Sequence, residues 1–268
     1  KKGLRQIKAD DQAMTWYEDF LEFVKQEQAF ATLLTPAAYG DGESRWDMWR
    51  LSEYNEVLAF YGLCYWYAWQ VTILGLGPIW MGDNAEAKLL AARLLREGGV
   101  FAFGLSERDH GADLYSSEMT LVPQADGSYL ARGSKYYIGN GNCAAQVSTF
   151  GKLADSGDYV FFVVDPEHPA YECAQKIETS GVRQAYVAEF TLHDYPITDG
   201  EILSRGALAW NSSLNTVNVG KYELGCASIG ICTHAFYEAI NHAAGRTLYG
   251  QQVTDFPHVK KIMTEAYA

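Results

Sequence analysis

Two segments of strand composition that end in small-residue turns most constrain how this chain can fold. In residues 100–113 (VFAFGLSERDHGAD), an apolar run ends in polar and small residues, as in a buried strand that presents a glycine turn to a ligand. Residues 129–141 (YLARGSKYYIGNG) also have strand composition and end at a Gly-Asn-Gly turn. Because both strands end in small residues and the second has aromatic residues near its tip, the pair predicts a seat for a planar cofactor.

The pattern of the chain changes twice, which predicts three domains. Residues 1–99 are predicted to form an N-terminal helical domain. Residues 100–205 contain short alternating strands and an Asp126-Gly127 hairpin signal, which indicates a middle β-barrel-like domain. Residues 206–268 return to helical periodicity and are predicted to begin a C-terminal helical bundle. The predicted fold class is therefore α+β.

The helical parts give more specific expectations. Trp16, Phe20, Phe23 and Val24 recur at helical spacing within residues 14–30 and are predicted to share one face. The aromatic residues from Tyr61 to Trp69 fit either plain core or the lining of an acyl or flavin pocket, and we favour core. Near the C-terminus we expect a long helix over residues 215–246 and another that opens at Pro257.

The net charge of −12, from 33 acidic and 21 basic residues, argues against nucleic-acid binding, which usually requires a basic surface. It leaves room for an anionic ligand such as coenzyme A, because a few local basic residues are enough to bind one. The five cysteines include no C-x-x-C pair, which favours free thiols in a reducing compartment over disulfides or a metal site.

Residues 57–80 (VLAFYGLCYWYAWQVTILGLGPIW) form an uncharged stretch long enough to cross a bilayer. The stretch contains polar residues, is interrupted by Gly75, Gly77 and Pro78, and has no clear charge bias at its flanks. We therefore predict a buried helix that breaks at these three residues, and no membrane span.

Three segments resemble the signatures of the FAD-dependent acyl-CoA dehydrogenase family. FGLSERDHGAD is similar to the family's aromatic strand with Thr/Ser-Glu-Pro and Gly-Ser-Asp, and GSKYYIGNG to its Gly-x-Lys-x-Trp-Ile-Thr-Asn. Arg246-Thr-Leu-Tyr-Gly250 is similar to Arg-x-x-Phe-Gly. The matches occur in the family's order and cover roughly residues 57 to 268. The chain starts without methionine and stops inside a helical pattern, so we expect a piece that ends before the C-terminal helical domain is complete.

The resemblance implies a set of FAD-binding residues: Phe103, Leu105, Ser106, Gly111, Ala112, Tyr137, Ile138, Gly139, Arg246 and Tyr249. Some of these positions depart from the family. Ser106 replaces a threonine and keeps a hydroxyl, and Tyr137 replaces a tryptophan and keeps an aromatic plane. Gly139 lacks the hydroxyl of the family threonine, although a backbone N–H can still donate. Ala112 replaces a serine beside the phosphates.

Arg246 matches the arginine that reaches across a subunit interface to the flavin pyrophosphate of the neighbour, and Tyr249 matches the aromatic residue beside it. A guanidinium suits phosphate because it is a fixed, always charged fork. The resemblance therefore implies a homodimer or homotetramer. Pro257 stands where the family often has glutamine, so the resemblance does not extend to that side chain.

The implied reaction is α,β-dehydrogenation of an acyl-CoA thioester, in which a carboxylate removes the α-proton and the β-hydrogen leaves as hydride to the flavin. One family position for the base aligns with Gly220, which has no side chain, and the other lies beyond Ala268. Glu223 is a weak candidate for a displaced base, and we expect it to face Lys221, a neighbouring subunit or solvent. Lys221 matches a family arginine near the substrate.

The predicted function is acyl-CoA dehydrogenase in fatty acid β-oxidation, with electrons passed to an electron-transfer flavoprotein. Two alternatives stay open: an oxygen-using oxidase of the same fold (acyl-CoA oxidase or nitroalkane-oxidase type) and a non-catalytic flavin-binding partner subunit. The expected location is the cytoplasm of a bacterium, or the mitochondrial matrix in a eukaryote.

Overall fold

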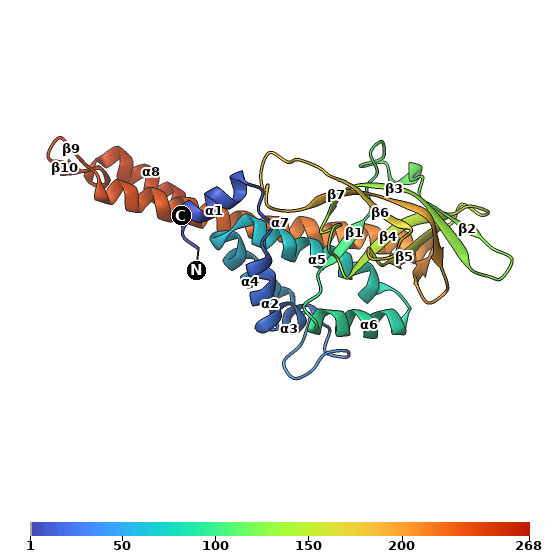
Figure 1. The fold of residues 1–268 in the computed structure, drawn as a ribbon. Helices are drawn as coiled ribbons and strands as arrows, with labels where there is room; N and C mark the ends of the chain where they lie inside the picture. Colours follow the sequence, from blue (N-terminus) through green and yellow to red (C-terminus); the bar gives the residue numbers. More distant parts are fainter. Residues whose placement is uncertain (1) are drawn as a thin grey trace.

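The computed structural model describes residues 2–268, and in these residues six helices precede a large sheet (Figure 1). The helices are α1 (Leu4–Gln12), α2 (Glu18–Gln26), α3 (Ala29–Leu34), α4 (Met48–Tyr61), α5 (Leu63–Met81) and α6 (Ala85–Arg96). The middle region contains β1 (Phe101–Gly104), the short helix η1 (Leu114–Ser116), β2 (Thr120–Pro123), β3 (Tyr129–Gly139), β4 (Gln146–Leu153), β5 (Tyr159–Val164), β6 (Tyr171–Lys176), β7 (Val187–Ile197) and β8 (Ile202–Arg205). The last part comprises α7 (Gly206–Gly245), β9 (Thr247–Leu248), β10 (Gln251–Gln252), η2 (Val253–Asp255) and α8 (Pro257–Tyr267). This order confirms the predicted α+β fold class.

The sheet of the middle region buries apolar side chains in two clusters, one of which it shares with the helices. Its strands follow the order β6-β7-β3-β2-β4-β5-β8, and β1 pairs in parallel with β4 beside this path. β2 and β3 form the hairpin predicted from Asp126-Gly127, and Gly127 takes the left-handed conformation at φ 86° that the turn requires. Phe162 and Phe190 are fully buried in the core. The domain division at residues 99 and 205 stays a prediction.

Helix α5 packs directly on β1, and a glycine makes this close approach possible. A Cβ on Gly75 would lie 2.7 Å from both the backbone nitrogen and the backbone oxygen of Ala102, so no larger residue fits. The Ser148 hydroxyl donates a hydrogen bond to the Gly75 carbonyl at 2.6 Å, which attaches β4 to the same point of the helix. The helix and the sheet are therefore joined at a fixed separation.

The predicted break at Gly75, Gly77 and Pro78 is wrong, because α5 continues past all three. A Cβ on Gly77 would lie 2.5 Å from the Thr216 hydroxyl of α7, so both glycines serve helix contacts and do not end the helix. Pro78 removes one backbone hydrogen bond, a cost that burial of the surrounding helix outweighs. The interruption lies at Gly62, between α4 and α5. None of the described helices is long and apolar enough to cross a membrane.

Aromatic residues of the first helices build the helical part of the core. Phe20 and Val24 of α2 are buried as predicted, but Phe23 is 52% exposed, so its predicted place on the same face is wrong. The buried face of this short helix is centred between Phe20 and Val24, and a residue three positions after Phe20 falls at its edge. Trp16 precedes the helix and stacks on the buried Tyr17, with ring centroids 4.2 Å apart.

Helix α7 is 40 residues long and begins at Gly206, earlier than predicted. Its first part packs on α4 and α5 through buried residues that recur every three or four positions: Ala209, Ser213, Thr216, Gly220, Glu223, Ala227 and Gly230. Figure 1 shows that the last turns of the helix, β9, β10 and α8 project away from the rest of the chain. We call residues 238–268 the distal arm. Ala243 is the one residue of the arm that is buried.

Candidate functional site

A cavity of about 380 Å³ lies where the ends of β1 and β3 meet α5 and α7. Six residues predicted for the site line it: Phe103, Leu105, Ser106, Tyr137, Gly139 and Lys221. The remaining lining comes from α5 (Trp66, Tyr67, Gln70, Val71 and Leu74) and α7 (Val217, Gly220 and Leu224). The volume falls within the range of small-molecule sites, about 300–1,000 Å³. The fold thus brings four separate segments of the sequence together around one space.

A bulge in β3 turns Tyr137 toward this cavity. Between Lys135 and Ile138, β3 has two residues where β7 has one. Tyr137 itself has φ 65°, a left-handed conformation that is costly for a residue with a Cβ and is typical of functional sites. The ring of Tyr137 is 60% exposed, whereas the next side chain, Ile138, is buried in the core of the sheet. The bulge therefore changes the alternation of the strand at the position that contributes an aromatic residue to the cavity lining.

Ser106 fastens the loop after β1 to this bulge. Its hydroxyl donates a hydrogen bond to the Tyr136 carbonyl at 2.6 Å, and the Tyr136 N–H donates to the Ser106 carbonyl at 2.9 Å. Because the single proton of the hydroxyl is used in this way, the Ser106 oxygen can only accept a hydrogen bond from a ligand. Sequence reasoning could not foresee this restriction, since it arises from the bulge.

Gly139 is required by a side chain of α5 and not by its own backbone conformation. A Cβ at this position would lie 2.7 Å from the Tyr67 hydroxyl and 2.7 Å from Cγ2 of Val71, so the family threonine does not fit. The Asn140 N–H donates to the Tyr186 carbonyl of the segment that precedes β7. Since the bonds of an antiparallel ladder alternate, the Gly139 N–H points away from β7 and stays outside that ladder.

Helix α7 closes the other side of the cavity. A Cβ on Gly220 would lie 2.8 Å from Cδ2 of Leu74, and the Gln70 amide donates to the Gly220 carbonyl at 3.0 Å. Gly220 itself carries no carboxylate, and a side chain at this position would require Leu74 to shift. Lys221, which also lines the cavity, brings a positive charge to the same wall.

A buried ion pair lies behind the loop that follows β1, and sequence analysis missed it. The Lys135 ammonium donates to Oε1 of Glu107 at 2.7 Å and to the Leu105 carbonyl at 2.9 Å. The Ser117 hydroxyl donates to the same carboxylate at 2.6 Å, and the Glu118 N–H donates to its other oxygen at 2.7 Å. The pair thus fixes the two cavity-lining segments against each other.

Burial and charge act in opposite directions on this pair. Burial lowers the pKa of Lys135 to about 8, although the neighbouring carboxylate favours its charged form. Burial alone would raise the pKa of Glu107, but the Lys135 charge and the donated hydrogen bonds together hold that pKa below its ordinary value. A lysine at an inward position of a strand, preceded by an acid at the end of another strand, is the signal that could have revealed the pair.

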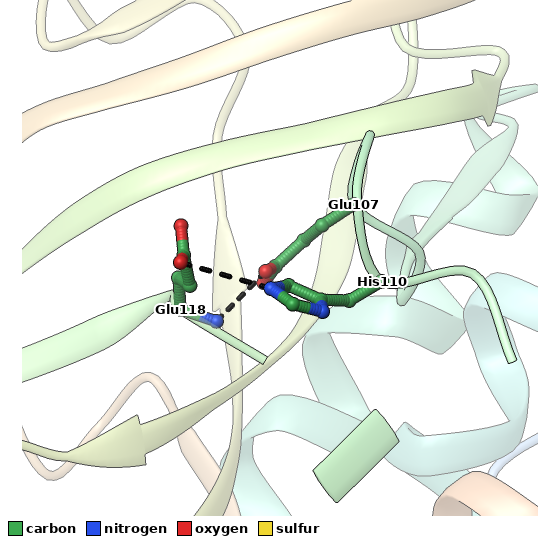
Figure 2. A group of neighbouring side chains, drawn as sticks. All are labelled: Glu107, His110 and Glu118. Carbon is green, nitrogen blue, oxygen red and sulfur yellow. Dashed lines mark hydrogen bonds and ion pairs between the residues drawn. The ribbon is translucent and has the colours of Figure 1, made fainter. Parts of the chain in front are cut away.

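Figure 2 shows Glu107 together with His110 and Glu118, whose potential metal-ligand atoms lie within 4.8 Å of one another. Nε2 of His110 lies 3.7 Å from Oε1 of Glu118, and the Glu118 side chain is 81% exposed. Both oxygens of Glu107 already accept hydrogen bonds, and the Lys135 ammonium offsets its charge. Hydrogen bonding explains this cluster, and we assign no metal to it.

Glu223 lies at the centre of the face of α7 that packs on α4 and α5, and it is fully buried. Neither carboxylate oxygen has a hydrogen-bond partner in the described residues, so the expected contact with Lys221 or solvent is wrong. Burial raises the pKa of Glu223 to about 7. Glu223 is also absent from the cavity lining, so the geometry does not favour it as the base.

Other predicted residues lie away from the cavity. Gly111 and Ala112 are in the exposed loop between β1 and η1, and Arg246 and Tyr249 flank β9 in the distal arm. The 25 positions from Lys221 to Arg246 (246 − 221) correspond to about 37 Å at 1.5 Å per residue. Arg246 therefore does not reach the cavity of its own chain, and its contact with a neighbouring subunit stays a prediction.

Comparison with known proteins agrees with this arrangement. A family model described as acyl-CoA dehydrogenase, middle domain, matches residues 102–195. An acyl-CoA dehydrogenase of Bacillus subtilis (strain 168) is 26% identical over 186 residues, which cover 68% of this chain and 49% of the relative. The chain thus spans about half the length of the curated relatives it matches.

Two solved structures share the fold. Butyryl-CoA dehydrogenase from Megasphaera elsdenii aligns with a TM-score of 0.88 at 20% identity, covering 97% of this chain and 69% of that one. An acyl-CoA dehydrogenase complexed with FAD from Bacillus anthracis aligns with a TM-score of 0.84 at 19% identity, covering 98% of this chain and 45% of that one. The family model thus matches the middle region of the chain, and the two structures show that the chain has the fold of the acyl-CoA dehydrogenases.

Proposed function

We propose that this chain binds FAD and belongs to an enzyme that dehydrogenates an acyl-CoA thioester and passes electrons to an electron-transfer flavoprotein. The observation that carries the proposal is the cavity, because six residues at the family's motif positions line it, from the ends of β1 and β3 and from α7. The complex of the Bacillus anthracis relative with FAD supports the choice of cofactor.

The lining fits a flat group with one polar edge. Phe103, Leu105 and Val71 supply an apolar wall, and the partly exposed ring of Tyr137 offers an aromatic face. The Gly139 N–H lies outside the strand ladder and is available as a donor. When bound, FAD would supply the hydride acceptor, while these residues hold and orient it.

Lys221 is proposed to act on the substrate side of the cavity. Negative charge develops on the thioester oxygen as the α-proton leaves, and a positive charge on the cavity wall stabilises it. The α-proton needs a carboxylate base, but Gly220 has no side chain and Glu223 lies off the cavity lining. We propose that the base comes from outside residues 2–268.

The distal arm is proposed to serve a second subunit. Arg246 is exposed and follows the last residue of α7, too far away to reach its own cavity, so a phosphate contact requires the cavity of a neighbouring chain. We therefore propose a homodimer or homotetramer in which each arm completes the cofactor site of its partner.

Two measurements on the purified protein test the function. FAD should bind at micromolar concentration, and failure to bind with the fold intact would contradict the proposal. Stopped-flow mixing of acyl-CoA with the full-length protein, which would include the proposed base, should then bleach the flavin without oxygen, and reoxidation by oxygen should be slow. Fast reoxidation would indicate the oxidase alternative, and no bleaching at all would indicate a non-catalytic flavin-binding subunit.

A further inference from the structure

We propose that the hydroxyl of Tyr67, on α5, replaces the hydroxyl missing at Gly139 and donates a hydrogen bond to the polar edge of the bound flavin. This inference rests on the proposed function and assigns a binding role to a residue outside the sequence motifs. Family resemblance implies only that position 139 has lost a donor; the structure shows what occupies the space.

The first observation is steric. The Tyr67 hydroxyl lies 2.7 Å, and its Cε1 2.8 Å, from the point where a residue-139 side chain would begin. Gly139 is not in the left-handed region, so its backbone would accept another residue. The glycine is needed because Tyr67 and Val71 fill the volume of its side chain. An oxygen atom thus lies close to the place where threonine would present one.

The second observation concerns hydrogen bonding. Tyr67 lines the cavity beside Tyr137 and Ser106, and its hydroxyl has no hydrogen-bond partner among the described residues. A tyrosine hydroxyl in a largely apolar setting normally finds a partner, and here the cavity is where one can come from. The Ser106 proton is already given to the Tyr136 carbonyl, so Ser106 does not compete for the same acceptor.

The protonation state fits this role. Burial raises the pKa of Tyr67 to about 12, so the hydroxyl keeps its proton at neutral pH and acts as a neutral donor. The ligand atom that it serves must therefore be an acceptor. Ring nitrogens and carbonyl oxygens at the edge of an isoalloxazine are such acceptors, and hydrogen bonds to them tune the electronics of the ring.

Tyr67→Phe removes the hydroxyl and keeps the ring. In titrations of the apo-protein we expect the FAD dissociation constant to rise about 2- to 10-fold, the range of one hydrogen bond, and the visible flavin bands to shift. Tyr65→Phe is the matched control, since Tyr65 is two residues earlier on α5 and stacks on Phe20 away from the cavity. The control should bind FAD as the wild type does.

A compensating pair tests the shared space without any cofactor. Gly139→Thr should destabilise the protein in thermal unfolding because it collides with Tyr67, whereas Tyr67→Ala/Gly139→Thr should recover part of that loss. Equal damage by Gly139→Thr in both backgrounds would contradict the steric argument.

The outcomes separate this inference from the proposed function. If neither the wild type nor Tyr65→Phe binds FAD, the proposed function is wrong and this inference falls with it. If both bind FAD and Tyr67→Phe shows the same affinity and spectrum, only the role of Tyr67 is overturned. A selective loss in Tyr67→Phe supports it.

Discussion

The two ends of α7 differ in how they are stabilised. From Gly206 to Gly230 the helix has a continuous buried face against α4, α5 and the sheet. In the distal arm only Ala243 is buried, while large apolar side chains are exposed, among them Tyr249 (95%), Ile262 (61%) and Tyr267 (81%). Since helices owe most of their stability to tertiary packing, the first region is stabilised within the chain, whereas the arm exposes a surface suited to contacts from outside it.

The largest expected effect is a loss of folding stability when the buried Lys135–Glu107 ion pair is broken. Lys135→Met leaves the Glu107 carboxylate buried without its cation, which should lower the free energy of unfolding by about 3–5 kcal/mol. Chemical denaturation monitored by circular dichroism measures the change. Lys261→Met in the arm is the matched control, because the exposed Lys261–Glu265 pair contributes no more than about 0.5 kcal/mol. Equal losses in the two variants would contradict the contrast between the regions.

The second largest effect is the pH dependence that Glu223 gives to the free energy of unfolding. Below pH 4.5 the Glu223 carboxyl is protonated in both the folded and the unfolded protein. Between pH 4.5 and about pH 7 the unfolded chain releases this proton, whereas the folded chain keeps it. Stability is therefore lost as pH rises through this window, by up to about 3 kcal/mol at 1.36 kcal/mol per pKa unit. Relative to Glu223→Gln, the wild type should become less stable by this amount between pH 4.5 and 8.

Chemical denaturation of the wild type and of Glu223→Gln at several pH values measures the difference between their free energies of unfolding. A pH-independent cost of burying the glutamine amide does not affect how this difference changes with pH. Glu238→Gln removes a carboxylate from the exposed end of the same helix and serves as the control. A difference between wild type and Glu223→Gln that stays constant from pH 4.5 to 8 would show that Glu223 does not titrate in this window.

Arg246→Ala should affect the cofactor and leave the protomer intact. Loss of a charge-assisted phosphate contact of about 1.5–3 kcal/mol corresponds to roughly a 10- to 150-fold weaker FAD affinity. Arg246→Lys should recover only part of the affinity, because lysine keeps the charge without the fork. Fluorescence titration measures both variants, and wild-type affinity in the alanine variant would remove Arg246 from the site.

The smallest effect on folding is expected for the apolar surface of the arm. Ile262→Ser should change the free energy of unfolding of the protomer by less than about 0.5 kcal/mol, because the side chain is exposed. The same change should weaken self-association in sedimentation velocity if the arm contacts a second copy. An unchanged oligomer would place the subunit contact elsewhere.

The sequence was most informative where local pattern and motif coincide. Phe103, Leu105, Ser106 and Gly139 could be placed around one site because they follow recognisable strand ends. The bulge at Tyr137 could not be foreseen, since nothing in the local sequence requires a tyrosine to take positive φ. It depends on pairing with β7, which is distant in sequence.

The residues missed by sequence analysis share one physical property: their roles depend on tertiary contacts. Trp69 is buried core as favoured, but Trp66 and Tyr67 line the cavity, and the aromatic spacing alone does not distinguish these positions. Lys135 is recognisable only once β3 lies beside the loop that contains Glu107. The predicted helix break was wrong for the same reason, because the glycines of α5 allow close contact with β1 and α7 and do not end the helix.

The contact between α5 and β1 also sets a dimension of the site. Trp66, Tyr67, Gln70, Val71 and Leu74 form one wall of the cavity, and Phe103 and Leu105 extend from the strand that Gly75 touches. Gly75 itself is not in the lining, yet any side chain there would push the two walls apart. The width of the cavity therefore depends on a residue outside its lining. It depends on Gly75 having a hydrogen atom where any other residue has a Cβ. Substitutions of lining residues can change which ligand binds, whereas a substitution at Gly75 would change the distance between the two walls of the cavity.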